Sequence, residues 1–214
     1  MSKNTKTTSC ICKKQGCWGD GNTKIPVYCQ ANKYSDILDN MNKKYAEKLF
    51  IKYYRAASLV SSKDNGMRTR IAEAIDFAKE MDFSKIGFAA CLAFDYEMGF
   101  IRKLFIKEGL DPIIVGCQIG NSTPEDRGVP DLQSYSNSTC NYLGQAEILN
   151  KENTQLNFIV GLCMGHDVIF TEHSNAPVST LFVKDRMTGN NPVAALHGYH
   201  LRKSLFGLDR WEKM

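Results

Sequence analysis

The chain has 214 residues, of which 43% are hydrophobic and 23% are charged, and 27 basic and 23 acidic residues give it a formal net charge of +4. This composition is typical of an ordinary globular protein, and the length allows one sizeable core with or without a small appendage. The lysines are spread along the chain, so the charge favours no nucleic-acid partner. No apolar run approaches the roughly 20 residues of a membrane helix, and residues 1–9 lack the apolar core of a signal peptide. We therefore expect a cytoplasmic protein without membrane contact.

Eight cysteines are the most informative feature of the composition. In a reducing cytoplasm, so many cysteines indicate metal ligands or catalytic groups rather than disulfides. They fall into two sets of four, one near the start of the chain and one spaced 23 to 26 residues apart in its second half. The sets are Cys10, Cys12, Cys17 and Cys29, and then Cys91, Cys117, Cys140 and Cys163.

The first cysteine set lies in a segment, residues 9–34, that has few apolar side chains to bury. Such a segment needs a staple to hold a fixed shape. Four cysteines within twenty residues favour a metal site, with structural zinc as the default and a second iron–sulfur cluster as the alternative, since the first pair is C-x-C. A disulfide pair is the plainer interpretation. We expect residues 1–34 to form a metal-binding segment and residues 35–214 an α/β domain with two leading helices.

Beyond this segment the apolar pattern alternates between helices and short strands. Helical patterns cover 35–60, 67–81, 96–108, 143–150, 168–173 and 192–204. Apolar runs of about five residues predict strands at 85–90, 112–116, 158–162 and 178–183. This alternation predicts a parallel, doubly wound, Rossmann-like sheet of four or five strands. The connection 118–139 is long for a compact domain, and such loops are usually functional or mobile.

The second cysteine set follows this predicted sheet. Cys91, Cys117 and Cys163 come directly after strands, and Cys140 precedes the helix that leads into the third strand. Right-handed crossovers place all strand carboxyl ends at one edge, where ligands bind in open α/β sheets. Four converging thiolates suit an iron–sulfur cluster, expected to be [4Fe-4S], or three could hold it and leave one iron open for substrate. The alternative is four small buried residues, because cysteine is often buried.

Four further side chains follow strands at the same edge. His166 and Asp167 come just after Cys163 in a glycine-flanked turn, where they could act as an acid–base pair or merely cap a helix. Lys184 and Arg186 follow the fourth strand and could bind a small anionic substrate or stand in a solvated turn. The chain has no G-x-G-x-x-G, P-loop or G-x-S-x-G motif.

Several motifs together resemble a known family. They are Gly161-Leu-Cys-Met-Gly-His-Asp, Ala176-Pro-Val-Ser-Thr-Leu, Val183-Lys-Asp-Arg and Asn191-Pro-Val-Ala-Ala-Leu, with the early cysteines. They are similar to an uncharacterised bacterial and archaeal family of predicted metal-binding proteins, domain of unknown function 1847, over nearly the whole chain. The resemblance implies metal binding through blocks that contain the second cysteine set and His166. It also implies an anaerobic host, which suits an oxygen-sensitive cluster, and it implies no particular reaction.

Three hypotheses for function follow. The leading one is an iron–sulfur enzyme with redox or lyase activity, in which His166 and Asp167 handle protons while Lys184 and Arg186 bind substrate. The second is a non-catalytic electron-transfer or metal-sensing module that docks a redox partner protein. The third is a metal-free enzyme in which Cys163 and His166 form a nucleophile pair.

Overall fold

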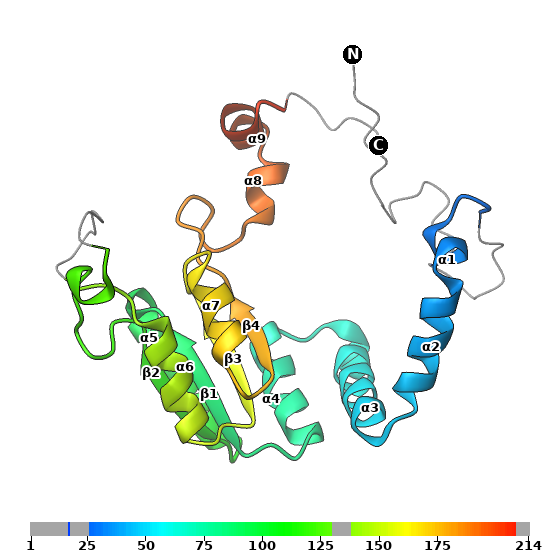
Figure 1. Ribbon diagram of the computed structural model, residues 1–214, viewed down its shortest axis with the longest axis horizontal. Helices are drawn as coiled ribbons and strands as arrows, with labels where there is room; N and C mark the ends of the chain where they lie inside the picture. Colours follow the sequence, from blue (N-terminus) through cyan, green and yellow to red (C-terminus); the bar gives the residue numbers. More distant parts are fainter. Residues whose placement is uncertain (1–16, 18–25, 130–137, 209–214) are drawn as a thin grey trace. The chain divides into compact units, whose positions relative to one another are not determined.

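The computed structural model describes residue 17 and residues 26–129 and 138–208 (Figure 1). The described chain divides into two units, with the boundary between Arg55 and Ala56. The first unit contains α1 (Gln30–Lys33), α2 (Ser35–Tyr45) and the start of α3 (Lys48–Ser62). The domain boundary expected after residue 34 stays a prediction, because most of the segment before it lies outside the described residues.

The single helix expected over residues 35–60 is wrong in one respect, because the chain breaks between α2 and α3. The N–H groups of Ala46 and Glu47 donate to the carbonyls of Lys43 and Lys44, three residues back. These tighter bonds close the last turn of α2 and stop the α-helical ladder. The apolar spacing continues through the break, so the sequence pattern did not reveal it.

The second unit is built on a four-stranded sheet, which confirms the predicted α/β class. Its strands are β1 (Lys85–Ala90), β2 (Asp111–Gly116), β3 (Leu156–Val160) and β4 (Val178–Phe182). All neighbouring pairs are parallel, and the order is β2-β1-β3-β4. β3 lies two residues earlier than expected, since Leu156 pairs with Ile86 and Gly161, with φ +59°, turns the chain out of the strand.

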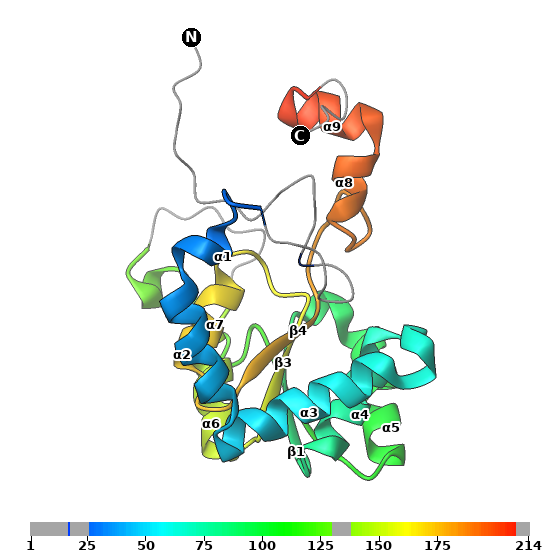
Figure 2. The same cartoon turned by 90° about the vertical axis from the view of Figure 1, so that its right-hand side faces the viewer.

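Helices cover both faces of this sheet, as Figure 2 shows. α6 (Tyr142–Lys151) and α7 (His166–His173) pack together on one side, and α4 (Arg70–Glu80) and α5 (Asp95–Lys107) lie on the other. The core is aromatic at its centre: Phe88 of β1 contacts Phe105 of α5 and Phe158 of β3, with ring centroids 4.9 and 5.7 Å away. All three rings are buried, so the carboxyl ends of the strands are held on a rigid base.

Shorter helices complete the unit: η1 (Lys63–Gly66), η2 (Leu92–Phe94), η3 (Glu125–Arg127), α8 (Val193–His197) and α9 (Tyr199–Phe206). The last helix, expected over residues 192–204, is split into α8 and α9 by the extended backbone of Gly198. In the part of the chain that the structure describes, no helix has both the length and the apolar character needed to cross a bilayer.

Candidate functional site

The four cysteines of the second set come together at the carboxyl edge of the sheet. Cys91 and Cys117 follow β1 and β2 and are buried, with 8% and 4% of their surface exposed, while Cys140 and Cys163 are half-buried. The thiol of Cys117 is in hydrogen-bonding contact with those of Cys91 and Cys140. These three thiols therefore form a continuous row, and Cys163 lies close enough to Cys140 for their charges to interact.

Backbone hydrogen bonds hold these loops in place. The N–H of Cys91 donates to the carbonyl of Val160 at 3.0 Å, which joins the ends of β1 and β3. The N–H of Asn141 donates to the carbonyl of Cys117 at 2.5 Å, so the loop carrying Cys140 is tied directly to the end of β2. Because neighbouring strands and the Cys140 loop are linked this way, the spacing of the thiols is set by the sheet.

One buried side chain reinforces the same arrangement. Gln145 of α6 is fully buried, and its Nε2 donates to the carbonyls of Ala90 at 3.2 Å and Val115 at 2.7 Å. These carbonyls lie just before Cys91 and Cys117. A single amide therefore connects the helix that follows Cys140 to the ends of β1 and β2, the strands that precede Cys91 and Cys117.

N–H donors lie against three of the four sulfur atoms, those of Cys91, Cys117 and Cys163. Lys184 Nζ donates to Cys91 Sγ at 2.6 Å, and Arg186 Nη2 lies 3.9 Å from Cys163 Sγ. Within η2, the backbone N–H of Ala93 donates to Cys91 and that of Leu92 to Cys117. Donors of this kind stabilise negative charge on sulfur. The backbone donors were missed by sequence reasoning, because side-chain identity carries no signal for them.

An aromatic wall lies beside Lys184. Its ammonium is 5.9 Å from the ring centre of Phe94, and Phe94 packs edge-on against Phe182 with centroids 4.9 Å apart. A Cβ atom at Gly161 would collide with the Phe94 ring, so this position has to be glycine for the ring to pack here. Phe94 was not identified from the sequence as part of the site.

The crowding of the thiols has opposite effects on their pKa values. The Cys117 thiol and burial together raise the pKa of Cys91 to about 12, although Lys184 acts in the other direction. The pKa of Cys140 falls to about 7, mainly because the Cys117 thiol donates a hydrogen bond to it. Cys140 is therefore the thiol of the row most readily ionised at neutral pH, and ionisation of Cys91 requires more positive charge nearby.

Two basic side chains, Lys184 and His166, have pKa values shifted by this environment. Burial lowers the pKa of Lys184, but the hydrogen bond and the charge of Cys91 outweigh it, so the pKa is raised overall. The pKa of His166 is lowered, first by burial and then by the positive charge of Lys184. At neutral pH the site thus contains a charged lysine and a neutral imidazole.

His166 and Asp167 have separate roles in the structure. The His166 ring stacks on Tyr142 with centroids 4.6 Å apart, which joins the Cys163 loop to the start of α6. The Asp167 carboxylate accepts from the N–H groups of Gly165 at 2.9 Å and Val168 at 2.8 Å, so it stabilises the first turn of α7. The bond that joins His166 to Cys163 is a backbone one, from N–H to carbonyl at 3.0 Å.

Within residue 17, residues 26–129 and residues 138–208, no group of three or more His, Cys, Asp or Glu is arranged to hold a metal ion. The predicted site in the first cysteine set stays a prediction, because Cys10 and Cys12 lie outside the described residues. Of its other members, Cys17 is exposed and Cys29 precedes α1.

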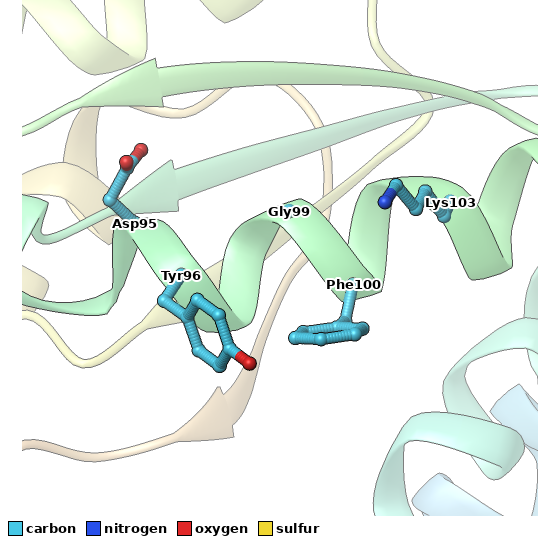
Figure 3. Close-up of a pocket in the computed structure, with 5 residues that line it drawn as sticks. All are labelled: Asp95, Tyr96, Gly99, Phe100 and Lys103. Carbon is cyan, nitrogen blue, oxygen red and sulfur yellow. The ribbon is translucent and has the colours of Figure 1, made fainter.

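A shallow hollow lies on α5 (Figure 3). Its volume is about 220 Å³, and its lining residues are Asp95, Tyr96, Gly99, Phe100 and Lys103. Small-molecule sites usually measure about 300–1,000 Å³ and draw on several elements. This hollow is formed by one helix and contains none of the four cysteines, so it gives no support for a substrate pocket at the sheet edge.

Comparison with known proteins identifies the family. A model described as protein of unknown function (DUF1847) matches residues 29–181. The chain belongs to this family. A curated relative in Methanocaldococcus jannaschii, described as an uncharacterised protein, is 33% identical over 177 residues, which is 80% of this chain and 90% of the relative. Membership confirms the resemblance seen in the sequence. The matched region contains all four sheet-edge cysteines and ends before Lys184.

Proposed function

We propose that this protein holds an iron–sulfur cluster at the carboxyl edge of its sheet through Cys91, Cys117, Cys140 and Cys163. The observation that carries the proposal is the row of touching thiols, since Cys91, Cys117 and Cys140 come from three separate loops yet contact one another. Cysteines that were buried only as small core residues would have no reason to gather at one place. An all-sulfur donor set suits soft metals and clusters.

The surroundings of the sulfur atoms support an anionic centre. Lys184, Arg186 and two backbone N–H groups of η2 point at sulfur. Neutral thiols gain little from such donors, whereas metal-bound thiolates are stabilised and oriented by them. The pKa of Cys91 is raised to about 12 by its hydrogen bond with the Cys117 thiol and by burial, and a bound cation would offset both effects by stabilising the thiolate.

Metal binding would require the thiols to move. Among the residues that the structure describes, no three or more His, Cys, Asp or Glu are arranged to hold a metal ion. In a cluster each thiolate binds a different metal atom, so thiols that now contact one another would move apart on binding. The proposal of a cluster therefore rests on the all-sulfur donor set and on the N–H donors around it.

We propose redox chemistry as the activity of the site. If one iron has no cysteine ligand and can bind substrate, lyase chemistry is the alternative. The cluster, when bound, supplies electron transfer. The chain supplies an asymmetric setting, with Cys91 and Cys117 buried and Cys140 and Cys163 half-exposed. A redox partner protein or a small substrate would approach from the side of Cys140 and Cys163, where the neutral His166 imidazole could accept a proton. A cytoplasmic location in an anaerobic host is part of this proposal.

A second candidate function is thiol chemistry without metal. The pKa of Cys140 is lowered to about 7, mainly by the hydrogen bond from the Cys117 thiol, so Cys140 forms the nucleophilic thiolate more readily than an ordinary cysteine. This observation favours Cys140 over Cys163 as the nucleophile, since the His166 ring stacks on Tyr142. The two candidate functions differ in whether iron is present.

The test is the iron and sulfide content of protein purified without oxygen, together with its visible spectrum. We expect iron and sulfide in the wild type, loss of both in Cys117→Ser, and retention in Cys29→Ser, which changes only the first cysteine set. Equal iron in the two variants would show that the sheet-edge thiols do not bind it. Protein with zinc but no iron would leave thiol chemistry as the better account.

A further inference from the structure

The segment Lys184–Asn190, which follows β4, is a turn held by its own side chains. The carboxylate of Asp185 accepts from the N–H groups of Met187 at 3.0 Å and Thr188 at 3.1 Å. The side-chain oxygen of Asn190 accepts from the N–H of Asp185 at 3.0 Å, and the N–H of Asn190 donates to the Asp185 carbonyl at 2.9 Å. Asp185 is thus the residue that shapes this turn, which we call the donor turn.

The donor turn presents its two cations to two different sulfur atoms. Lys184 Nζ lies 2.6 Å from the buried Cys91 Sγ, and Arg186 Nη2 lies 3.9 Å from the half-buried Cys163 Sγ. The intervening Asp185 is occupied by the turn, so both basic side chains can face the thiols.

The placement of Lys184 argues against a primary role in binding a free anion. Its side chain is half-buried beside Phe94, and its ammonium is in direct contact with sulfur. Burial of an ammonium group is unfavourable unless an acceptor offsets the loss of hydration. Here the Cys91 contact does so, which also explains why the pKa of Lys184 is raised despite burial.

We infer that Lys184 and Arg186 are positioning residues of the metal centre, acting as charged hydrogen-bond donors to Cys91 and Cys163. This inference rests on the proposed function. Four thiolates give a centre of net negative charge, and two cations at its edge offset that charge and orient two of its ligands. The donor turn therefore favours an all-thiolate anionic centre. In this inference Lys184 and Arg186 bind the cysteine sulfur atoms instead of the anionic substrate expected from the sequence.

The test compares Lys184→Met, Lys184→Arg and the control Lys103→Met, which changes an exposed lysine on α5. Each protein is loaded with ferrous iron and sulfide without oxygen. The readouts are the chelator concentration that removes half of the iron and the reduction potential from a titration followed by visible absorbance.

We expect Lys184→Met to lose iron at about 10- to 100-fold less chelator and to have a more negative potential, because a cation stabilises the reduced centre. Lys184→Arg should restore both values, and Lys103→Met should match the wild type.

The outcomes separate this inference from the proposed function. If the wild type loads iron, Cys117→Ser does not, and Lys184→Met matches the wild type in both readouts, then the inference is overturned alone. If the wild type takes up no iron at these cysteines, the proposed function and this inference are both overturned.

Should Lys184→Met fail to fold, Arg186→Gln replaces it, since Arg186 is exposed. It is expected to shift both readouts in the same direction by a smaller amount, and an unchanged potential and iron retention would contradict the role.

Discussion

At the scale of single residues, contact with the Cys117 thiol gives Cys140 and Cys91 different pKa values and therefore different reactivity at neutral pH. In metal-free protein we expect alkylation of Cys140 to accelerate as the pH rises through about 7, because the thiolate is the reactive form and its pKa is about 7. Cys91, with a pKa of about 12, should stay unmodified over the same range. Mass spectrometry of iodoacetamide-treated peptides between pH 5 and 9 measures both. Identical pH profiles for the two cysteines would contradict this ordering.

Gly161 is a residue at which backbone and side-chain constraints coincide. Its φ is +59°, and an added methyl group would collide with Phe94. We expect Gly161→Ala to lower the free energy of unfolding by about 1–3 kcal/mol, as measured by urea denaturation. Gly99→Ala is the matched control: it lies inside α5 with open space around its Cβ position, so it should be neutral or stabilising by up to about 1 kcal/mol. Equal effects of the two changes would show that the Phe94 contact is unimportant.

At the scale of elements, α6 is linked to the sheet through one buried amide. Gln145→Leu would leave the carbonyls of Ala90 and Val115 without this donor, so we expect a loss of about 1–3 kcal/mol in unfolding free energy. Because those carbonyls precede Cys91 and Cys117, the variant should also lose iron more readily. Glu147→Leu on the exposed side of α6 is the control, and it should change the unfolding free energy by less than about 0.5 kcal/mol. If both variants unfold at the same urea concentration, the amide does not brace the strands.

Element boundaries were predictable to different degrees, for physical reasons. The strands before Cys91 and Cys117 were located to within one residue, because each is an apolar run of five or six residues, which is too short for a core helix and is bounded by turn residues. The breaks after α2 and at Gly198 were missed, since the helical apolar spacing continues on both sides. A change of backbone conformation at one or two residues leaves that spacing intact.

At the scale of the whole molecule, metal binding should stabilise the second unit, because only the folded chain brings the four thiols together. With free metal at about a hundredfold excess over its dissociation constant, the gain is about 2.7 kcal/mol in unfolding free energy. Urea unfolding of iron-loaded and chelator-treated protein measures it. Cys117→Ser should show no difference between the two conditions. A wild type equally stable in both would indicate that the metal does not bind at the folded sheet edge.

The amino-acid sequence by itself determined that the second cysteine set lies at one edge of a parallel sheet. Strands joined by helical crossovers run parallel, so the carboxyl end of every strand lies at the same edge of the sheet. Which atoms meet there was decided only by the tertiary structure. Lys184 and Cys91 are 93 residues apart and touch because β4 and β1 flank β3 in the sheet. Local spacing could not show that Asp185 braces a turn while its two basic neighbours face sulfur, because these directions depend on contacts between distant loops.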